Sequence, residues 1–121
     1  MSDYLIAFND EWVSDLSEEE YARASRDVKA LRAEMEAAGV LVYLNGLDET
    51  APVFSVDATS GTPMFTDGPF VESKEHLGGF ALVSCPDDEA ARMWAGRVAE
   101  ACPWPHEVHR FRVHGQRPTS T

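Results

Sequence analysis

Side chains able to move protons gather in one stretch of this 121-residue sequence. Asp67 supplies a carboxylate, and His76 supplies an imidazole nine residues further on. Such a pair is typical of general acid–base catalysis, in which one group takes a proton and the other gives one. Lys74 lies between them and would orient an anionic group of a substrate. We therefore regard Asp67 and His76 as candidate catalytic residues.

The segment that holds Asp67 is first of all a turn. Gly68 can adopt backbone angles that other residues avoid, and Pro69 fixes the angle that follows. Asp67 can accept hydrogen bonds from the backbone that comes after it. A rigid corner between two strands therefore accounts for these residues without any ligand. If the corner instead borders a pocket, the candidate ligand-binding residues are Thr66, Gly68, Pro69, Phe70, Lys74 and Gly79.

Two neighbouring glycines, Gly78 and Gly79, lie near the start of an apolar run at 77–85. They do not make a phosphate-binding loop, because the sequence lacks the GxGxxG and GxxxxGK frames there and a strand follows instead of a helix. Glycine at such a place in a strand indicates that a neighbouring side chain or a ligand approaches the backbone closely.

The spacing of apolar residues predicts two helices and six strands. The helix over 17–38 has the clearest pattern, because Ser17 and Glu20 form a capping box and Gly39 follows its end. A second helix begins at 86–89, where acidic residues favour the helix dipole, and it ends before Pro103. The predicted strands span 4–8, 40–44, 53–56, 63–65, 77–85 and 107–113.

This order predicts one α+β domain over residues 1–113, followed by a flexible tail at 114–121. Without the hairpin at 53–65, the order becomes βαββαβ, the ferredoxin-like arrangement, in which both helices cover one face of an antiparallel sheet. The other face must be covered as well, and a second copy is the simplest cover for so small a domain. We therefore expect a homodimer that packs sheet against sheet.

The charge and composition exclude several classes of partner. Twenty-one acidic against 10 basic residues give a net charge of −11, so nucleic acids and anionic membrane surfaces are disfavoured. The apolar runs are too short to span a membrane, and we expect no signal peptide. Cys85 and Cys102 do not make a disulfide scaffold, and no His and Cys residues have metal-ligand spacing. The sequence thus favours a cytoplasmic protein with no metal and no cofactor.

A longer stretch of the chain carries a family resemblance. Residues 66–80 read TDGPFVESKEHLGGF, which resembles the signature of the DGPF branch of the YCII-related proteins. The segments GVL at 39–41, GL at 46–47 and EV at 107–108 are similar to the family pattern too. The resemblance extends over nearly the whole chain.

This resemblance implies a ferredoxin-like fold that dimerises into an α/β barrel. Members of the branch are small bacterial proteins, mostly without an assigned activity, and many are encoded beside extracytoplasmic-function sigma factors. Some YCII-like relatives are enzymes, thought to use a His–Asp pair in a cleft. Asp67 corresponds to that aspartate. The histidine of those relatives lies in the first half of the chain, where this sequence has none before His76.

Three functions remain open at this point, because one fold can serve many activities. The protein could bind a small organic metabolite in a pocket near Asp67, in a response linked to a sigma factor. It could be a small lyase or isomerase that uses Asp67 as acid or base, with Lys74 or His76 assisting. It could also be a structural dimer that binds no ligand.

Overall fold

The computed structural model describes residues 1–69 and 75–113, so the predicted tail lies outside the described residues. The elements, in chain order, are β1 (Ser2–Asn9), η1 (Asp10–Trp12), α1 (Glu18–Ala37), β2 (Leu41–Gly46), β3 (Phe54–Asp57), β4 (Met64–Asp67), β5 (Leu77–Cys85), α2 (Asp88–Ala101) and β6 (Glu107–Arg110). Four strands form an antiparallel sheet in the order β2-β5-β1-β6, whereas β3 and β4 form a separate two-stranded sheet. The predicted α+β class is confirmed, and the arrangement is consistent with a ferredoxin-like fold.

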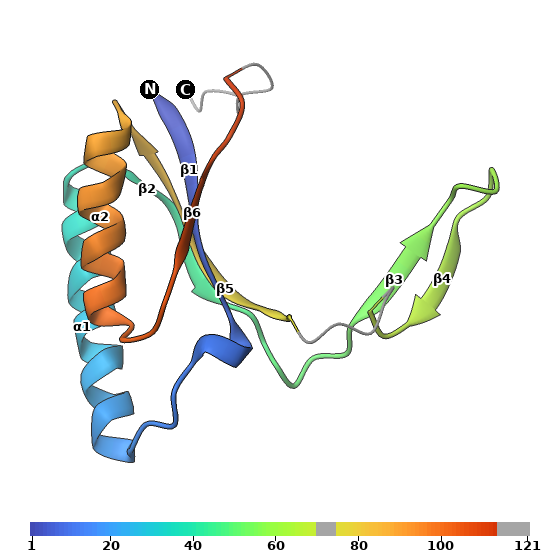
Figure 1. Cartoon of the computed structure of the whole chain (residues 1–121), viewed down its shortest axis with the longest axis horizontal. Coiled ribbons are helices and arrows are strands. Elements are labelled where there is room, and N and C mark those ends of the chain that lie inside the picture. Colours follow the sequence, from blue (N-terminus) through green and yellow to red (C-terminus); the bar gives the residue numbers. More distant parts are fainter. Residues whose placement is uncertain (70–74, 114–121) are drawn as a thin grey trace.

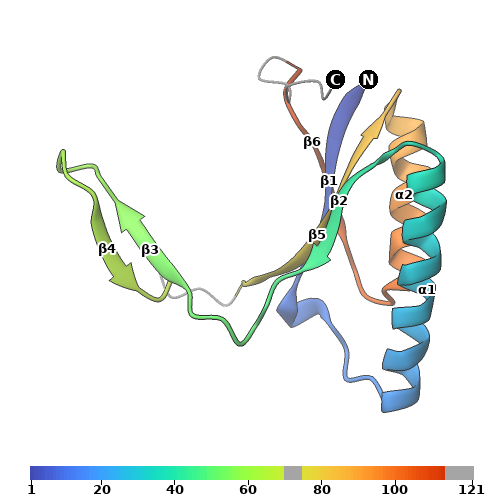
Figure 2. The same ribbon diagram turned by 180° about the vertical axis from the view of Figure 1, so that it is seen from behind.

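Both helices lie on the same face of the four-stranded sheet (Figures 1 and 2). The core lies between these two layers, where Ile6, Met35, Val83 and Cys85 are completely buried. Side chains alternate between the two faces of a strand, so Leu5 on β1 and its partner Leu82 on β5 point away from the helices. No helix of the described chain covers that second face, which we call the open face.

The first helix begins and ends as the sequence predicts. The Ser17 hydroxyl accepts a hydrogen bond from the Glu20 backbone N–H at 3.1 Å, and the Glu20 carboxylate accepts one from the Ser17 N–H at 3.2 Å. Gly39 follows the helix with a φ of +73°, a conformation that favours glycine. Leu41 starts β2 two residues later, so the strand lies directly against the helix that precedes it.

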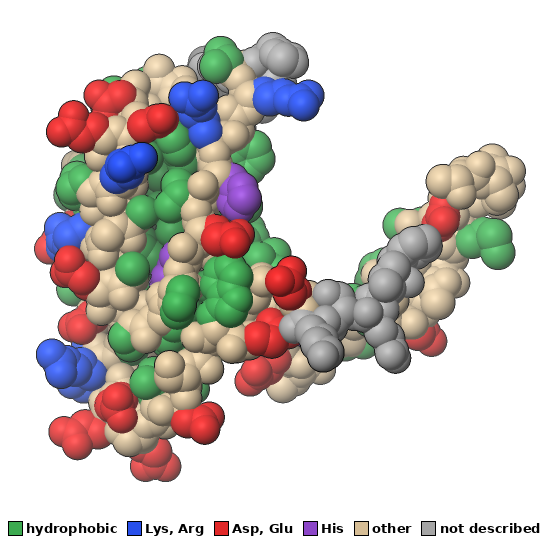
Figure 3. Space-filling model, viewed as in Figure 1, with side chains coloured by type: hydrophobic (Ala, Val, Ile, Leu, Met, Phe, Trp, Pro, Cys, Tyr) green, Lys and Arg blue, Asp and Glu red, His purple; other side chains and the backbone are tan. Residues whose placement is uncertain are grey.

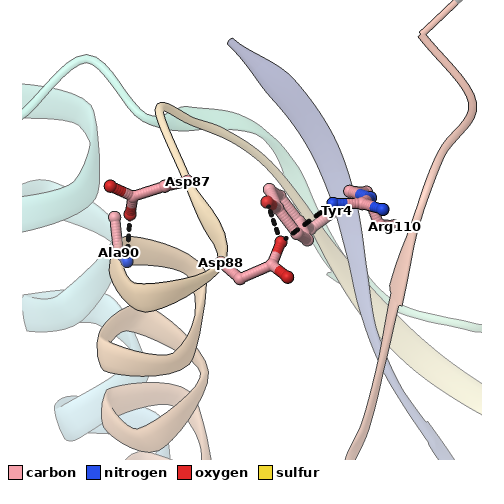
Figure 4. A network of polar contacts seen from close by, with 5 residues as sticks. All are labelled: Tyr4, Asp87, Asp88, Ala90 and Arg110. Carbon is pink, nitrogen blue, oxygen red and sulfur yellow. Dashed lines mark hydrogen bonds and ion pairs between the residues drawn. The ribbon is translucent and has the colours of Figure 1, made fainter.

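A polar network joins the start of α2 to the sheet (Figure 4). The Asp87 carboxylate caps the helix by accepting a hydrogen bond from the Ala90 N–H at 2.8 Å. The Tyr4 hydroxyl of β1 donates to Asp88 at 2.6 Å, and Arg110 of β6 donates to the same carboxylate oxygen at 3.3 Å. The hydrogen bond from Tyr4 lowers the pKa of Asp88, because it stabilises the ionised form of the carboxylate.

The two-stranded sheet, which we call the arm, projects from the end of the main sheet where β2 stops and β5 starts (Figure 1). The pairing register sets its two faces. Phe54 pairs with Asp67 and Val56 with Phe65, so these four residues share one face. The opposite face carries Ser55, Asp57, Met64 and Thr66.

The bounds of β5 match the prediction, whereas the other five strands differ from it at one or both ends, and the pairing explains two of the differences. The strand predicted at 63–65 is β4, which continues to Asp67 because Thr66 and Asp67 still pair with β3. The last strand was predicted to reach residue 113, but β6 ends at Arg110. Its partner β1 begins at Ser2. The backbone N–H of Phe111 donates to the carbonyl of Asp3 at 2.9 Å, one residue from that beginning. Little of β1 therefore remains for residues 112–113 to pair with.

The capping box predicts a specific cost at the start of α1. Replacing Ser17 with Ala removes the acceptor for the Glu20 N–H and should lower the free energy of unfolding by about 1 kcal/mol. The matched control is Ser25→Ala, in the exposed middle of the same helix, which should leave stability unchanged or raise it by up to about 0.5 kcal/mol. Urea unfolding of the two variants checks this. Equal effects would contradict a role for the cap.

Candidate functional site

The corner after β4 is fixed by its backbone. Gly68 has a φ of +90°, which explains why glycine is needed there. Its N–H donates to the Val53 carbonyl at 2.7 Å, and its own carbonyl accepts a hydrogen bond from the Ser55 hydroxyl at 2.7 Å. The corner is therefore pinned to β3, and the predicted rigid turn starts one residue after Asp67.

Asp67 itself lies in an unusual place for a carboxylate. It is exposed, and it shares the face of the arm that carries Phe54, Val56 and Phe65. A single negative group thus borders an apolar surface whose aromatic rings, Phe54 and Phe65, lie 6.5 Å apart between centroids. A surface of this kind provides an orienting polar group beside apolar contacts, which is the usual composition of a site for an organic ligand.

The other predicted binding residues of this segment are not shown to lie together with Asp67. Thr66 lies on the opposite face of the arm, where it lines a shallow pocket with Ser55 and Met64. Pro69 is exposed after the corner. The candidate binding residues Phe70 and Lys74 lie outside the described residues.

His76 contacts Glu11 in the short helix that follows β1. The backbone N–H of His76 donates to one Glu11 carboxylate oxygen at 3.0 Å, and the ring Nδ1 contacts the other. These hydrogen bonds lower the pKa of Glu11. A carboxylate that holds Nδ1 fixes the orientation of the imidazole and leaves Nε2 for proton transfer.

The structure therefore joins His76 to Glu11, and within the described chain no contact joins it to Asp67. Sequence reasoning missed Glu11, which is 65 positions away from His76. The signal that could have placed Glu11 beside His76 was the antiparallel pairing of β1 with β5. Once Asn9 lies opposite Leu77, the residues that follow β1 must lie beside those that precede β5.

The two glycines of β5 allow a close approach of neighbouring groups, as the sequence predicts. A Cβ on Gly78 would lie 2.6 Å from the Phe8 ring. A Cβ on Gly79 would lie 2.9 Å from the Gly46 Cα and 3.0 Å from the Asn45 carbonyl. The neighbours are thus a side chain and the backbone of β2, whereas the predicted role of Gly79 in ligand binding stays a prediction.

A cavity of about 210 Å³ lies between the helices and one end of the sheet. Its wall is almost entirely apolar, with Phe8 from β1, Leu31 from α1, Leu44 from β2 and Val98 from α2. Trp104 and His106, from the segment after α2, complete it. The sequence did not single out this cavity, because its walls come from six separate segments, β5 included, that only the packing brings together.

The described residues hold no group of three or more His, Cys, Asp or Glu side chains placed to bind a metal ion. Among the same residues, no helix is long and apolar enough to cross a membrane.

The fold and the site describe a small α+β protein in which the helices cover one face of the main sheet and the arm projects from its end (Figures 1 and 2). The model of the YCII-related domain matches residues 6–104, which is most of the chain. The protein belongs to the family of YCII-related domains. It is also similar to "Uncharacterized protein R00369" of Rhizobium meliloti (strain 1021), with 33% identity over 100 residues, covering 82% of this chain and 81% of that protein.

The close approach at Gly79 generates a prediction about stability. In Gly79→Ala the new methyl group meets the backbone of β2, which cannot move cheaply, so the free energy of unfolding should fall by about 1–3 kcal/mol. Gly46→Ala, in the facing strand, is the control. Its Cβ would lie at an ordinary 3.7 Å from its nearest neighbour, so little change is expected. Chemical denaturation of both variants measures the difference, and equal stability would contradict the steric argument.

Proposed function

We propose that this protein is a homodimeric, cytoplasmic member of the DGPF branch that binds a small organic metabolite beside Asp67. The observation that carries the proposal is the location of Asp67 on the apolar face of the arm. The two free cysteines, Cys85 and Cys102, fit a reducing compartment such as the cytoplasm. The link to an extracytoplasmic-function sigma factor rests on the family resemblance alone, and would make the metabolite a signal for regulation.

The arm supports dimerisation because its apolar face is left open to water. Phe54, Val56 and Phe65 remain 67%, 56% and 69% exposed. Burial of such side chains contributes about 1.5–3 kcal/mol each. A contiguous exposed apolar surface of this kind commonly marks a protein–protein interface.

The open face of the main sheet is the matching surface. Its apolar side chains include Leu5 and Leu82 at its centre and the half-exposed Tyr43, which pairs with Leu82 from the edge strand β2. The main sheet with its helices lies on one side of a wide hollow, and the arm lies on the other (Figure 3). Two copies that pack through their open faces, each with its arm against the partner, would cover both apolar surfaces.

Such a dimer would change the surroundings of Asp67. A carboxylate buried between two protomers needs a cation or a hydrogen-bond donor, because an unpaired buried charge is strongly unfavourable. A polar group of a metabolite would meet that need while the rings of Phe54 and Phe65 contact its apolar part. We therefore infer that the metabolite site is completed only by the second copy.

The second candidate function is a small lyase or isomerase in which Asp67 acts as acid or base. The Glu11–His76 pair favours it, because an imidazole oriented by a carboxylate is a common proton acceptor in enzymes. In this case His76, with Glu11 as its positioning residue, would act separately from Asp67 in one chain. Turnover of a bound metabolite, lost in His76→Gln, separates this function from binding alone.

The dimer is tested through the arm. Wild-type protein at micromolar concentration should have twice the mass of one chain in light scattering. Phe65→Asp places a charge on the apolar face and should weaken dimerisation by about 2 kcal/mol, or roughly 30-fold. Met93→Asp is the control, because Met93 is a similarly exposed apolar residue on α2. A monomeric wild type, or equal weakening by both changes, would sink the proposal.

The role of Asp67 is tested by a thermal-shift screen of metabolites on wild type and Asp67→Asn. A ligand present at 100 times its dissociation constant should stabilise wild type by roughly 2.7 kcal/mol. The Asn variant should lose most of this gain, since it lacks the charge. Asp57→Asn, on the opposite face of the arm, should keep it. Equal shifts in all three proteins would show that the ligand binds away from Asp67, and the absence of any ligand for wild type would favour a structural dimer instead.

A further inference from the structure

The cavity between the helices and the sheet has the size and lining of a small-molecule site that is separate from Asp67. Its volume of about 210 Å³ exceeds the roughly 150 Å³ of an apolar protein cavity that accepts benzene. The aromatic ring of Phe8 and the aliphatic side chains of Leu44 and Val98 line it. A molecule with one aromatic ring therefore fits in it.

Two residues that line this cavity each have a buried polar atom that lacks a partner among the described residues. The two atoms are the indole nitrogen Nε1 of Trp104 and the ring nitrogen Nε2 of His106. The other His106 nitrogen, Nδ1, lies 2.7 Å from the Trp104 carbonyl, which can only accept a hydrogen bond, so Nδ1 carries the proton. Nε2 is then an acceptor and Trp104 Nε1 is a donor. Leaving such buried groups unpaired costs about 1–3 kcal/mol each.

The lining of the cavity carries no formal charge. Burial lowers the pKa of His106, which favours its neutral form, and raises the pKa of Cys102, which also lines the cavity, to about 11. No Asp, Glu, Lys or Arg of the described chain belongs to the lining. A charged ligand would lose its hydration without gaining an ion pair, so the cavity selects uncharged molecules.

We propose that this cavity binds one uncharged, single-ring aromatic molecule that carries a hydroxyl group. A hydroxyl both donates and accepts, so it is the simplest group that can pair with His106 Nε2 or with Trp104 Nε1. Both atoms are shielded from solvent, so the two rings, which stack with centroids 6.3 Å apart, shift toward the ligand on binding. The site lies within one chain and needs neither the arm nor a second copy.

The test is an NMR titration of ¹⁵N-labelled wild-type protein with phenol, toluene and benzoate. Phenol should bind and shift the signals of residues that line the cavity, Trp104 Nε1–H above all. Toluene has the same shape without the hydroxyl and should bind about two- to tenfold more weakly, the value of one hydrogen bond. Benzoate should not bind there. Equal affinities for phenol and toluene, or shifts scattered over the surface, would overturn the proposal.

Three variants separate this site from a general affinity for aromatic molecules. Ala101→Leu fills the cavity from α2 and should abolish phenol binding, whereas Ala99→Leu makes the same change two residues away, outside the lining, and should not. His106→Phe keeps an aromatic ring but removes both nitrogens, Nε2 among them, so it should reduce the preference for phenol over toluene even if Ala101→Leu fails to fold. Asp67→Asn should bind phenol like wild type. Unchanged binding in Ala101→Leu or an unchanged preference in His106→Phe would refute the assignment.

Discussion

Two helices can cover only one face of a four-stranded sheet, and this constraint governs the rest of the molecule. The covered face holds the core around Ile6, Met35 and Val83. The other face presents Leu5 and Leu82 to solvent, although both are apolar. Exposure of such surface to water has a cost in free energy, which supports the proposal that a second copy covers it. The arm adds a second apolar surface rather than covering the first.

The arm also explains how one segment can contain a turn and the proposed binding residue together. Gly68 closes the corner and ties it to β3, while Asp67 remains in the strand and takes its direction from the pairing with Phe54. The pairing of β4 with β3 therefore places the carboxylate beside the apolar rings, and the turn at Gly68 ends that pairing. The structural and the functional interpretations of the motif concern neighbouring residues with different tasks, and they do not compete.

Local signals made much of the fold predictable. Ser17, Glu20 and Gly39 specify the ends of α1 through hydrogen bonds and backbone angles within a few residues, and the bounds of β5 follow from one apolar run. The candidate site was harder to predict from the sequence. The contact of His76 with Glu11 depends on the register of β1 with β5, and the face that Asp67 occupies depends on the register of the arm. The cavity depends on how α1 and α2 pack, which no short pattern encodes.

The position of β1 has a consequence for the order in which the chain can fold. This strand leaves the ribosome before both of its partners, which are β5, at residues 77–85, and β6, at 107–110. Contacts so distant in sequence form slowly, because a long loop must close first. The helix α1, stabilised by its own capping box, can form early, whereas the apolar residues of β1 remain unpaired at that stage. During synthesis the apolar residues of β1 thus stay unpaired until β5 has emerged, and unpaired strands are open to aggregation.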